Sequence, residues 1–256
     1  TPSNSSAASD VYKRQALMFV YYLITRWKEL GKINGKEYIV KTIVTTETIK
    51  TIAERNGVEM YDVYTGFKWI ANVMRENEGK KNYIGGGEES YGFLCEDFVR
   101  DKDAVSACVI LAEIAAWAKD QGLSLYQLLQ KIYVEYGFSK EKGISVVKKG
   151  KSGAEEIEAM MKKFRENPLT EIAGSKVTYF YDYSTLKGKD YAENETVTLD
   201  MPTTSNVLQY FTEDNTKVSI RPSGTEPKIK FYCEVHSKVT VSYTHLRAHE
   251  TRSNLV

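Results

Sequence analysis

The sequence predicts an α/β protein in two parts, a three-layer α/β/α domain at residues 16–137 and a smaller α+β domain at residues 154–240. Three observations support this prediction. Strand-like and helix-like segments alternate over the first part, as expected for helices packed on both faces of a sheet. Residues 138–153 are basic, dotted with glycine and weakly apolar, which indicates a hinge or an edge strand. The second part then holds one amphipathic helix and several segments typical of antiparallel strands.

Local signals mark the elements at the start of the first domain. Residues 16–30 are expected to form a buried helix that Gly31 closes. The β-branched residues at 38–46 predict a strand, and the apolar spacing after it predicts a helix that ends at Gly57. A short strand, a tight turn and another helix follow over residues 58–77.

The glycine-rich segment at residues 81–93 then predicts a strand, a loop and the start of another strand. Asp103 is expected to cap a long apolar helix that ends at Gly122, and Ser124 to cap the next one. The second domain is expected to begin with a helix that Pro168 stops. Its predicted strands are KVTYFYDYS, SNVLQYFT, KVSI and KIKFYCEVHS.

Composition narrows the class of protein. Hydrophobic residues make up 42% and charged residues 27% of the 256 residues, which is typical of a globular chain. The formal charge of +1 gives no indication of nucleic-acid or anionic-membrane binding. Three scattered cysteines predict buried, reduced thiols in a cytoplasmic protein. The most apolar run, at residues 16–24, is too short to cross a bilayer.

Both ends of the chain are expected to be unrelated to the fold. Asp10–Gln15 can be encoded by GATGTGTATAAGAGACAG, and the opposite strand of that DNA encodes the Val-Ser-Tyr-Thr-His near the other end. One DNA string in inverted orientation would therefore flank the chain, as translated sequencing-adaptor DNA does. Residues 1–15 and 241–256 are accordingly treated as tails. His245 and His249, whose spacing would otherwise suit two metal ligands, fall in the second tail.

The stretch IGGGEESYGF places two carboxylates and a hydroxyl among glycines. Glycine allows backbone amides to approach a ligand and to adopt positive φ. Glu88 and Ser90, two residues apart, can point the same way from an extended segment and contact the hydroxyls of a polyol. The plainer alternative is a glycine-rich hairpin with solvated glutamates, and this stretch alone leaves both possibilities open.

The stretch IRPSGTEPKIKFY is a stronger candidate, for an anion site. Arg221 offers a fork of donors for two phosphate oxygens. Ser223 and Thr225 add hydroxyls, and the turn at Gly224 can present backbone amides to an anion. The alternative is a β-turn with an incidental arginine.

Two more segments place polar residues close to helix starts. Thr65 and Gly66 stand at a strand-to-helix turn, and the N-terminus of a helix favours anions. Arg100 and Lys102 precede the helix that Asp103 is expected to cap. A solvated, charged turn is the alternative there.

In this order, TGFKWI, GGGEESYGF, RDKDA and RPSGTEPKIKFY resemble the last two domains of the α-D-phosphohexomutase family, and most closely its bacterial phosphoglucomutase/phosphomannomutase proteins. The resemblance covers about residues 16–239. It implies a TATA-box-binding-protein-like α+β fold for the second domain and a cytoplasmic enzyme that acts on hexose phosphate. A Glu-Glu-Ser loop could suit glucose or mannose, and its second glutamate favours glucose.

The resemblance also implies roles for the candidate residues. Lys102 would line the cleft as a catalytic candidate. The substrate-binding residues that it implies are Thr65, Gly66, Glu88, Ser90 and Arg100. The residues that would bind the non-reacting phosphate are Arg221, Ser223, Gly224 and Thr225.

The family moves a phosphoryl group from an active-site phosphoserine to a hexose phosphate through a hexose 1,6-bisphosphate, with Mg²⁺ offsetting the developing charge. Its serine loop and aspartate-rich metal loop belong to the first two domains, and neither motif occurs in this sequence. The resemblance thus implies a fragment, clipped at its start: the substrate-recognition half of an isomerase, inactive by itself, with no catalytic serine and no metal ligand. The alternative is a free-standing, non-catalytic sugar-phosphate-binding protein.

Overall fold

The computed structural model describes residues 5–89, 92–148, 150–224, 226–237 and 239. The backbone divides into two compact units, whose principal segments are Val11–Ser139 and Lys140–His236. None of the helices among these residues combines the length and the apolar composition that a membrane span requires.

The first unit is a three-layer α/β/α fold, which confirms the prediction. Its sheet has the order β2-β1-β3-β4, in which β1 pairs in parallel with β2 and β3, and β4 runs antiparallel to β3. Its elements are α1 (Ser5–Glu29), β1 (Glu37–Thr42), α2 (Thr48–Arg55), β2 (Glu59–Val63), α3 (Phe67–Glu76), β3 (Asn82–Gly87), β4 (Phe93–Cys95), α4 (Ala104–Asp120) and α5 (Leu125–Tyr136).

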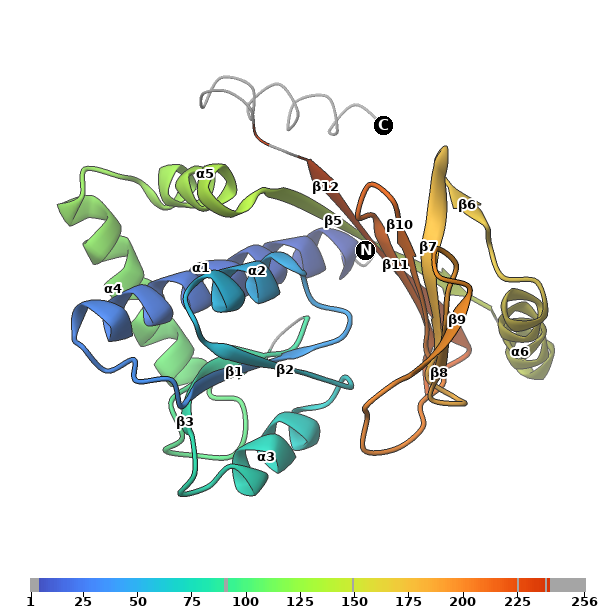
Figure 1. The fold of residues 1–256 in the computed structure, drawn as a ribbon, viewed down its shortest axis with the longest axis horizontal. Helices are drawn as coiled ribbons and strands as arrows, with labels where there is room; N and C mark the ends of the chain where they lie inside the picture. Colours follow the sequence, from blue (N-terminus) through green and yellow to red (C-terminus); the bar gives the residue numbers. More distant parts are fainter. Residues whose placement is uncertain (1–4, 90–91, 149, 225, 238, 240–256) are drawn as a thin grey trace. The chain divides into compact units, whose positions relative to one another are not determined.

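Two hydrophobic clusters cover the two faces of this sheet. Successive residues of a strand point to opposite faces. On one face Tyr38 and Val40 of β1 pack with Phe67 of α3. On the other face Ile39 packs in a larger cluster with apolar residues of α1, α2, α4 and α5. Figure 1 shows α3 on one side of the strands and α1 with α2 on the other, so the sheet is the middle layer.

Two boundaries in this unit differ from the predicted ones. α1 begins at Ser5 and not at residue 16, so it is continuous with the segment that the sequence set apart as a tail. β1 ends at Thr42 and not at residue 46. The strand stops there because the N–H of Thr45 donates to the carbonyl of Thr42, at 2.9 Å, and turns the chain.

The three glycines of IGGGEE lie in β3 and not in a loop, and none of them has a positive φ. A Cβ added at Gly86 would lie 2.2 Å from the carbonyl oxygen of Val40, and one at Gly87 would lie 2.4 Å from that of Gly92. These glycines therefore permit close approach of neighbouring backbones. The expectation that they provide positive φ is wrong.

The helix caps of this unit are as predicted. The side chain of Asp103 accepts from the backbone N–H of Val105 and of Ser106 at the start of α4. Ser124 and Gln127 form a reciprocal capping box at the start of α5. Each cap satisfies N–H groups that have no partner within the first turn of a helix.

One prediction about the cysteines is wrong. Cys95 is buried and Cys233 is partly buried, but Cys108 is exposed on α4. The same helix exposes Val105 and Val109, at 74% and 60%. The apolar composition of this helix therefore does not place all of its residues in the core.

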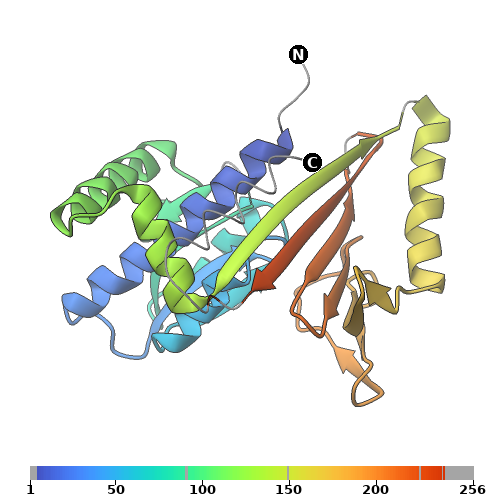
Figure 2. The same cartoon turned by 90° about the horizontal axis from the view of Figure 1, so that it is seen from above.

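The second unit is an α+β fold built on an antiparallel sheet, as predicted. The strand order is β5-β12-β11-β10-β7-β8-β9, with β6 paired to β7, and Figure 2 shows β5 and β12 side by side. Its elements are β5 (Phe138–Val147), α6 (Gly150–Glu166), β6 (Glu171–Ile172), β7 (Ser175–Asp182), β8 (Lys187–Asp190), β9 (Glu195–Thr198), β10 (Leu208–Thr212), β11 (Lys217–Pro222) and β12 (Lys228–Ser237).

One face of this sheet packs against α6. Ile157 and Met161 of the helix contact a cluster that includes Leu208 and Tyr210 of β10. The first ten residues of the segment predicted to be a hinge or an edge strand form β5, at one end of the strand order, whereas residues 150–153 already belong to α6. Three short strands, β6, β8 and β9, were not predicted. β8 and β9 are mostly polar and lie towards the other end of the sheet, where the apolar alternation that marks a half-buried strand is not needed.

His236 lies in a charged cluster between β5, β11 and β12. Its Nε2 is 3.0 Å from Glu234 Oε1, while Glu234 Oε2 is 3.4 Å from the Nζ of Lys217, and Glu141 of β5 also faces the ring. Burial alone would lower the pKa of His236. The hydrogen bond and charge of Glu234, with the charge of Glu141, outweigh burial and raise that pKa above the ordinary 6.5.

The stability of the second unit should therefore depend on pH. Because the folded-state pKa of His236 is raised, protonation stabilises the fold fully below pH 6.5, and this stabilisation is lost as the pH rises through the folded-state value. We expect a higher melting temperature at pH 6 than at pH 8. His236→Gln should remove most of this difference. An equal pH dependence in the variant would contradict the assignment to His236.

Candidate sugar and phosphate sites

The candidate residues of the first unit gather at one edge of its sheet. Because β1, β2 and β3 are parallel, their carboxyl ends meet at the same edge, where α/β proteins commonly bind ligands. Thr42 ends β1, Thr65 and Gly66 follow β2, and Glu88 follows β3. The structure thus brings Thr65, Gly66 and Glu88 together.

Glu88 contacts the start of α3 directly. Its Oε2 accepts from the backbone N–H of Gly66 at 2.8 Å. Gly66 is the N-cap of α3 and has a φ of +118°, which side chains rarely allow. The N-terminal end of a helix favours negative charge, so this position stabilises the ionised carboxylate.

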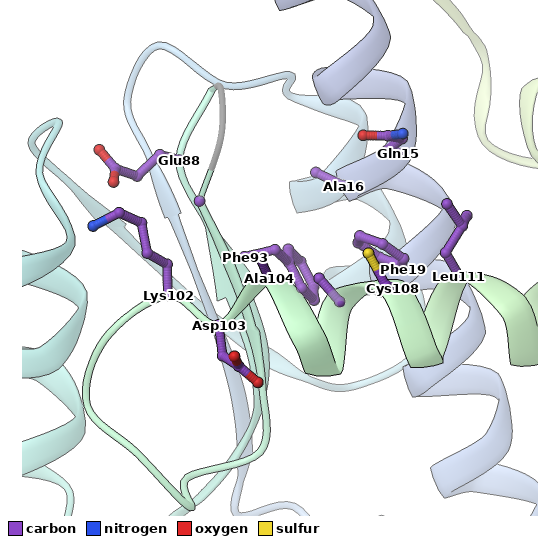
Figure 3. A pocket seen from close by; sticks show the side chains of 12 residues that line it. Gln15, Ala16, Phe19, Glu88, Phe93, Lys102, Asp103, Ala104, Cys108 and Leu111 are labelled. Carbon is purple, nitrogen blue, oxygen red and sulfur yellow. The ribbon is translucent and has the colours of Figure 1, made fainter.

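Lys102 shares a pocket with Glu88. The pocket has a volume of about 300 Å³, and Figure 3 shows both charged side chains at one end of it, with apolar side chains at the other. Lys102 Nζ lies 3.2 Å from Asp101 Oδ1, so its charge is partly balanced. The lining residues are Gln15, Ala16, Phe19, Glu88, Gly92, Phe93, Lys102, Asp103, Ala104, Ala107, Cys108 and Leu111.

This end of the pocket has the chemistry that a hydroxylated ligand requires. A carboxylate accepts from sugar hydroxyls, and an ammonium group donates to hydroxyl or phosphate oxygens. Both groups lie next to regular structure, one directly after β3 and one directly before the Asp103 cap of α4.

Arg100 does not line this pocket. It lies at a second cavity of about 420 Å³ with Lys68, Asn72 and Arg75, and its guanidinium is 2.7 Å from Glu78 Oε1. Arg100 and Lys102 thus line different pockets of this unit, and the roles predicted for them remain predictions. The two residues are separated because the loop between β4 and α4 directs their side chains to different cavities.

The predicted phosphate loop connects β11 and β12. Its first residues are held by the hairpin, since the N–H of Ser223 donates to the carbonyl of Lys228 at 2.7 Å. Glu226 forms an ion pair with Lys228 and not with Arg221; its Oε2 lies 2.7 Å from the Nζ of Lys228. Gly224 is exposed and has no positive φ.

Arg221 is the strongest anion-binding candidate of this loop. It is partly buried at the end of β11, and its guanidinium has no ion-pair partner among the residues described. Its register partner on β12 is Lys230, so the two side chains project from the same face of the sheet. Two cations side by side would attract a doubly charged phosphate group.

The sequence did not single out three residues that the structure places at these sites. Lys230 could have been found from the hairpin register across the loop. Glu89 is buried beside Glu88 and accepts from threonine hydroxyls. Lys41, also buried, lies 3.0 Å from Glu47 Oε1 and 2.6 Å from Asp62 Oδ1. Glu89 lies inside the glycine-rich stretch, where only Glu88 and Ser90 were predicted to contact a ligand, and no sequence motif marks Lys41.

The environment of Lys41 keeps it charged. Burial alone would lower its pKa, but the carboxylates of Asp62 and Glu47 outweigh burial and raise it. The resulting ion pairs link the end of β1 to β2 and to the start of α2. Lys41 therefore helps to fix the carboxyl end of β1, one residue before Thr42.

Two predicted site residues, Ser90 and Thr225, lie outside the described part of the chain. Within that part, no group of three or more His, Cys, Asp or Glu side chains could hold a metal ion. The described residues therefore offer no fit for Mg²⁺.

Comparison with known proteins identifies both halves of the chain. Residues 17–136 match the family model of phosphoglucomutase/phosphomannomutase, alpha/beta/alpha domain III, and residues 145–245 match the C-terminal domain of the same family. The second match ends inside the predicted tail at residues 241–256. The predicted domain limits remain predictions.

Relatives of known sequence and structure agree with these matches. A phosphoglucomutase of Staphylococcus haemolyticus is 35% identical over 221 residues, which cover 86% of this chain and 39% of that protein. One from Staphylococcus aureus (strain bovine RF122) is 40% identical over 194 residues, or 76% of this chain and 35% of that protein. The chain thus spans less than two fifths of their length.

Two solved structures share the fold. The phosphoglucomutase parafusin of Paramecium, in its open form, gives a TM-score of 0.60 at 18% identity, over 90% of this chain and 38% of that one. A phosphoglucomutase/phosphomannomutase family protein of Burkholderia thailandensis gives 0.52 at 15% identity, over 88% and 37%.

Proposed function

Because the chain belongs to the phosphoglucomutase/phosphomannomutase family, we propose that its two units are the substrate-recognition half of an enzyme that interconverts hexose 1-phosphate and hexose 6-phosphate. In this proposal the first unit binds sugar hydroxyls through Glu88, with Thr65 and Gly66 beside it. Ser90 would add a hydroxyl contact. Lys102 faces the same pocket and would donate to a ligand oxygen.

The second unit would bind the phosphate group that does not react. The observation that supports this most is the partly buried Arg221, which has no ion-pair partner among the described residues and has Lys230 opposite it. A guanidinium can donate two parallel hydrogen bonds to a phosphate, which fixes its orientation as well as its position. Ser223, Gly224 and Thr225 would complete the site.

We assign neither a nucleophile nor a metal ligand to this chain. When bound, Mg²⁺ would offset the charge that develops on the transferred phosphoryl group. The described residues do not fit that ion, so their part is to bind and orient the hexose phosphate, including a hexose 1,6-bisphosphate. Such positioning is one of the larger contributions to phosphoryl-transfer rates.

Isothermal titration calorimetry of the chain with glucose 1-phosphate, mannose 1-phosphate and glucose tests this proposal. We expect both phosphorylated sugars to bind at least about tenfold more tightly than glucose, because a charge-assisted pair contributes about 1.5–3 kcal/mol. A coupled assay should show no mutase turnover by this chain alone. Equal affinity for glucose and glucose 1-phosphate would contradict the phosphate site. Turnover by this chain alone would contradict the proposal that it carries no catalytic nucleophile.

A further inference from the structure

The adjacent residues Glu88 and Glu89 direct their carboxylates to different partners. Glu88 is partly buried, lines the pocket and accepts from the N–H of Gly66. Glu89 is only 4% exposed. Its Oε2 accepts from the hydroxyl of Thr42 at 3.1 Å and from that of Thr65 at 3.4 Å.

These contacts join the ends of three neighbouring strands. Thr42 is the last residue of β1, Thr65 follows β2, and Glu89 follows β3. The hydroxyl of Thr42 is also 2.8 Å from that of Thr45, in the turn after β1. One buried carboxylate oxygen therefore connects the segments that carry Glu88 and its donor Gly66.

Burial makes the hydrogen bonds of Glu89 costly to break, because water cannot readily replace the threonine hydroxyls. A buried acceptor that loses its donors leaves polar atoms without hydrogen bonds, which costs free energy, so the two threonine contacts favour one position of this side chain. The Glu89 carboxylate is consequently held beside the two threonines. Glu88 is joined to Glu89 by one peptide bond, so the position of its carboxylate is restricted as well.

We propose that Glu89 is a positioning residue for sugar recognition: by binding Thr42 and Thr65, it holds the Glu88 carboxylate against the Gly66 amide and in the pocket. This inference deepens the proposed function and rests on it for the identity of the ligand. The hydrogen-bond geometry within the protein does not depend on that identity, so the two can be tested separately.

The test compares Glu89→Leu and Glu89→Gln with the unchanged chain. Hydrogen exchange at the Gly66 amide reports whether Glu88 is still in place. We expect exchange about tenfold faster in Glu89→Leu, a factor that corresponds to about 1.4 kcal/mol, and affinity for glucose 1-phosphate about tenfold lower. Glu89→Gln keeps an oxygen that accepts from the threonines, so it should restore most of both.

A matched control is Glu37→Leu. Glu37 is also a buried carboxylate, but it begins β1 at the opposite edge of the sheet, where it accepts from the N–H groups of Asn34 and Gly35. This variant should lower global stability without a selective effect at Gly66. If Glu89→Leu does not fold, Thr42→Val and Thr65→Val remove one donor each and should accelerate Gly66 exchange by a smaller factor.

The outcomes separate the two proposals. Unchanged Gly66 exchange in every folded variant at Glu89, Thr42 and Thr65 would overturn the positioning role. An effect at Gly66 no larger than in Glu37→Leu would do the same, because it would reflect general destabilisation. A third outcome is that the variants selectively lose protection at Gly66 while even the unchanged chain does not bind glucose 1-phosphate. That outcome would support the role of Glu89 and overturn the proposed function.

Discussion

Replacing Gly86 with alanine should destabilise the first unit by about 3 kcal/mol or more, at the upper end of the range for overpacked interiors. The added Cβ would lie 2.2 Å from the carbonyl oxygen of Val40 and 3.0 Å from its carbonyl carbon. Both atoms belong to the backbone of β1, which pairs with β2 on its other side. The strand cannot move aside without breaking a parallel pairing.

Urea denaturation followed by circular dichroism measures this effect. Gly143→Ala is the matched control, because Gly143 also lies in a strand, has no positive φ, and has no heavy atom within 4 Å of an added Cβ. That variant should change the free energy of unfolding by less than about 1 kcal/mol. Similar urea midpoints for both variants would show that β1 and β3 are not packed as closely as described.

The same glycines show what the sequence could not reveal. Their composition suggested a ligand loop, because glycine permits unusual backbone conformations. Only the strand order explains them, since β3 lies between β1 and β4 and its backbone approaches both. A close approach between segments far apart in the chain leaves no local signal beyond the glycines themselves.

The elements that the sequence predicted well are those with a clear apolar period or a cap. The helices capped by Asp103 and Ser124 begin where expected, and the strands of the first unit alternate with helices. The strands β8 and β9 were missed because they are short and mostly polar, and they show no alternation of apolar and polar residues that would mark a half-buried strand. The exposed Cys108 was misjudged because composition does not say which face of a helix is buried.

At the candidate sites, local spacing was informative only along one strand or turn. The proximity of Glu88 to Gly66 follows from the parallel pairing of β1 with β2 and with β3, which the sequence analysis did not predict. The position of Lys230 opposite Arg221 depends on the register of a hairpin. The hydrogen bonds of Glu89 depend on threonine hydroxyls at the ends of two other strands. That Arg100 and Lys102 line different pockets could not be predicted, because the direction of a loop side chain cannot be deduced from sequence.

Arg221→Ala should weaken the binding of glucose 1-phosphate far more than that of free glucose. The substitution removes a charge-assisted fork worth about 1.5–3 kcal/mol, which corresponds to a roughly 10–150-fold increase in the dissociation constant. The guanidinium has no ion-pair partner among the described residues, so its removal leaves no unpaired carboxylate behind. We therefore expect little change in the free energy of unfolding.

The matched control for this prediction is Arg165→Ala, which removes the same charge from the same unit. Arg165 donates to Asp182 at 3.1 Å and also to Asn206, so it is already engaged within the protein. This variant should lose stability and keep its affinity for glucose 1-phosphate. Calorimetry of both variants with both ligands distinguishes a local phosphate contact from a general loss of positive charge. If Arg221→Ala weakens glucose and glucose 1-phosphate equally, or if Arg165→Ala weakens the phosphorylated sugar just as much, the loop between β11 and β12 is not the phosphate site.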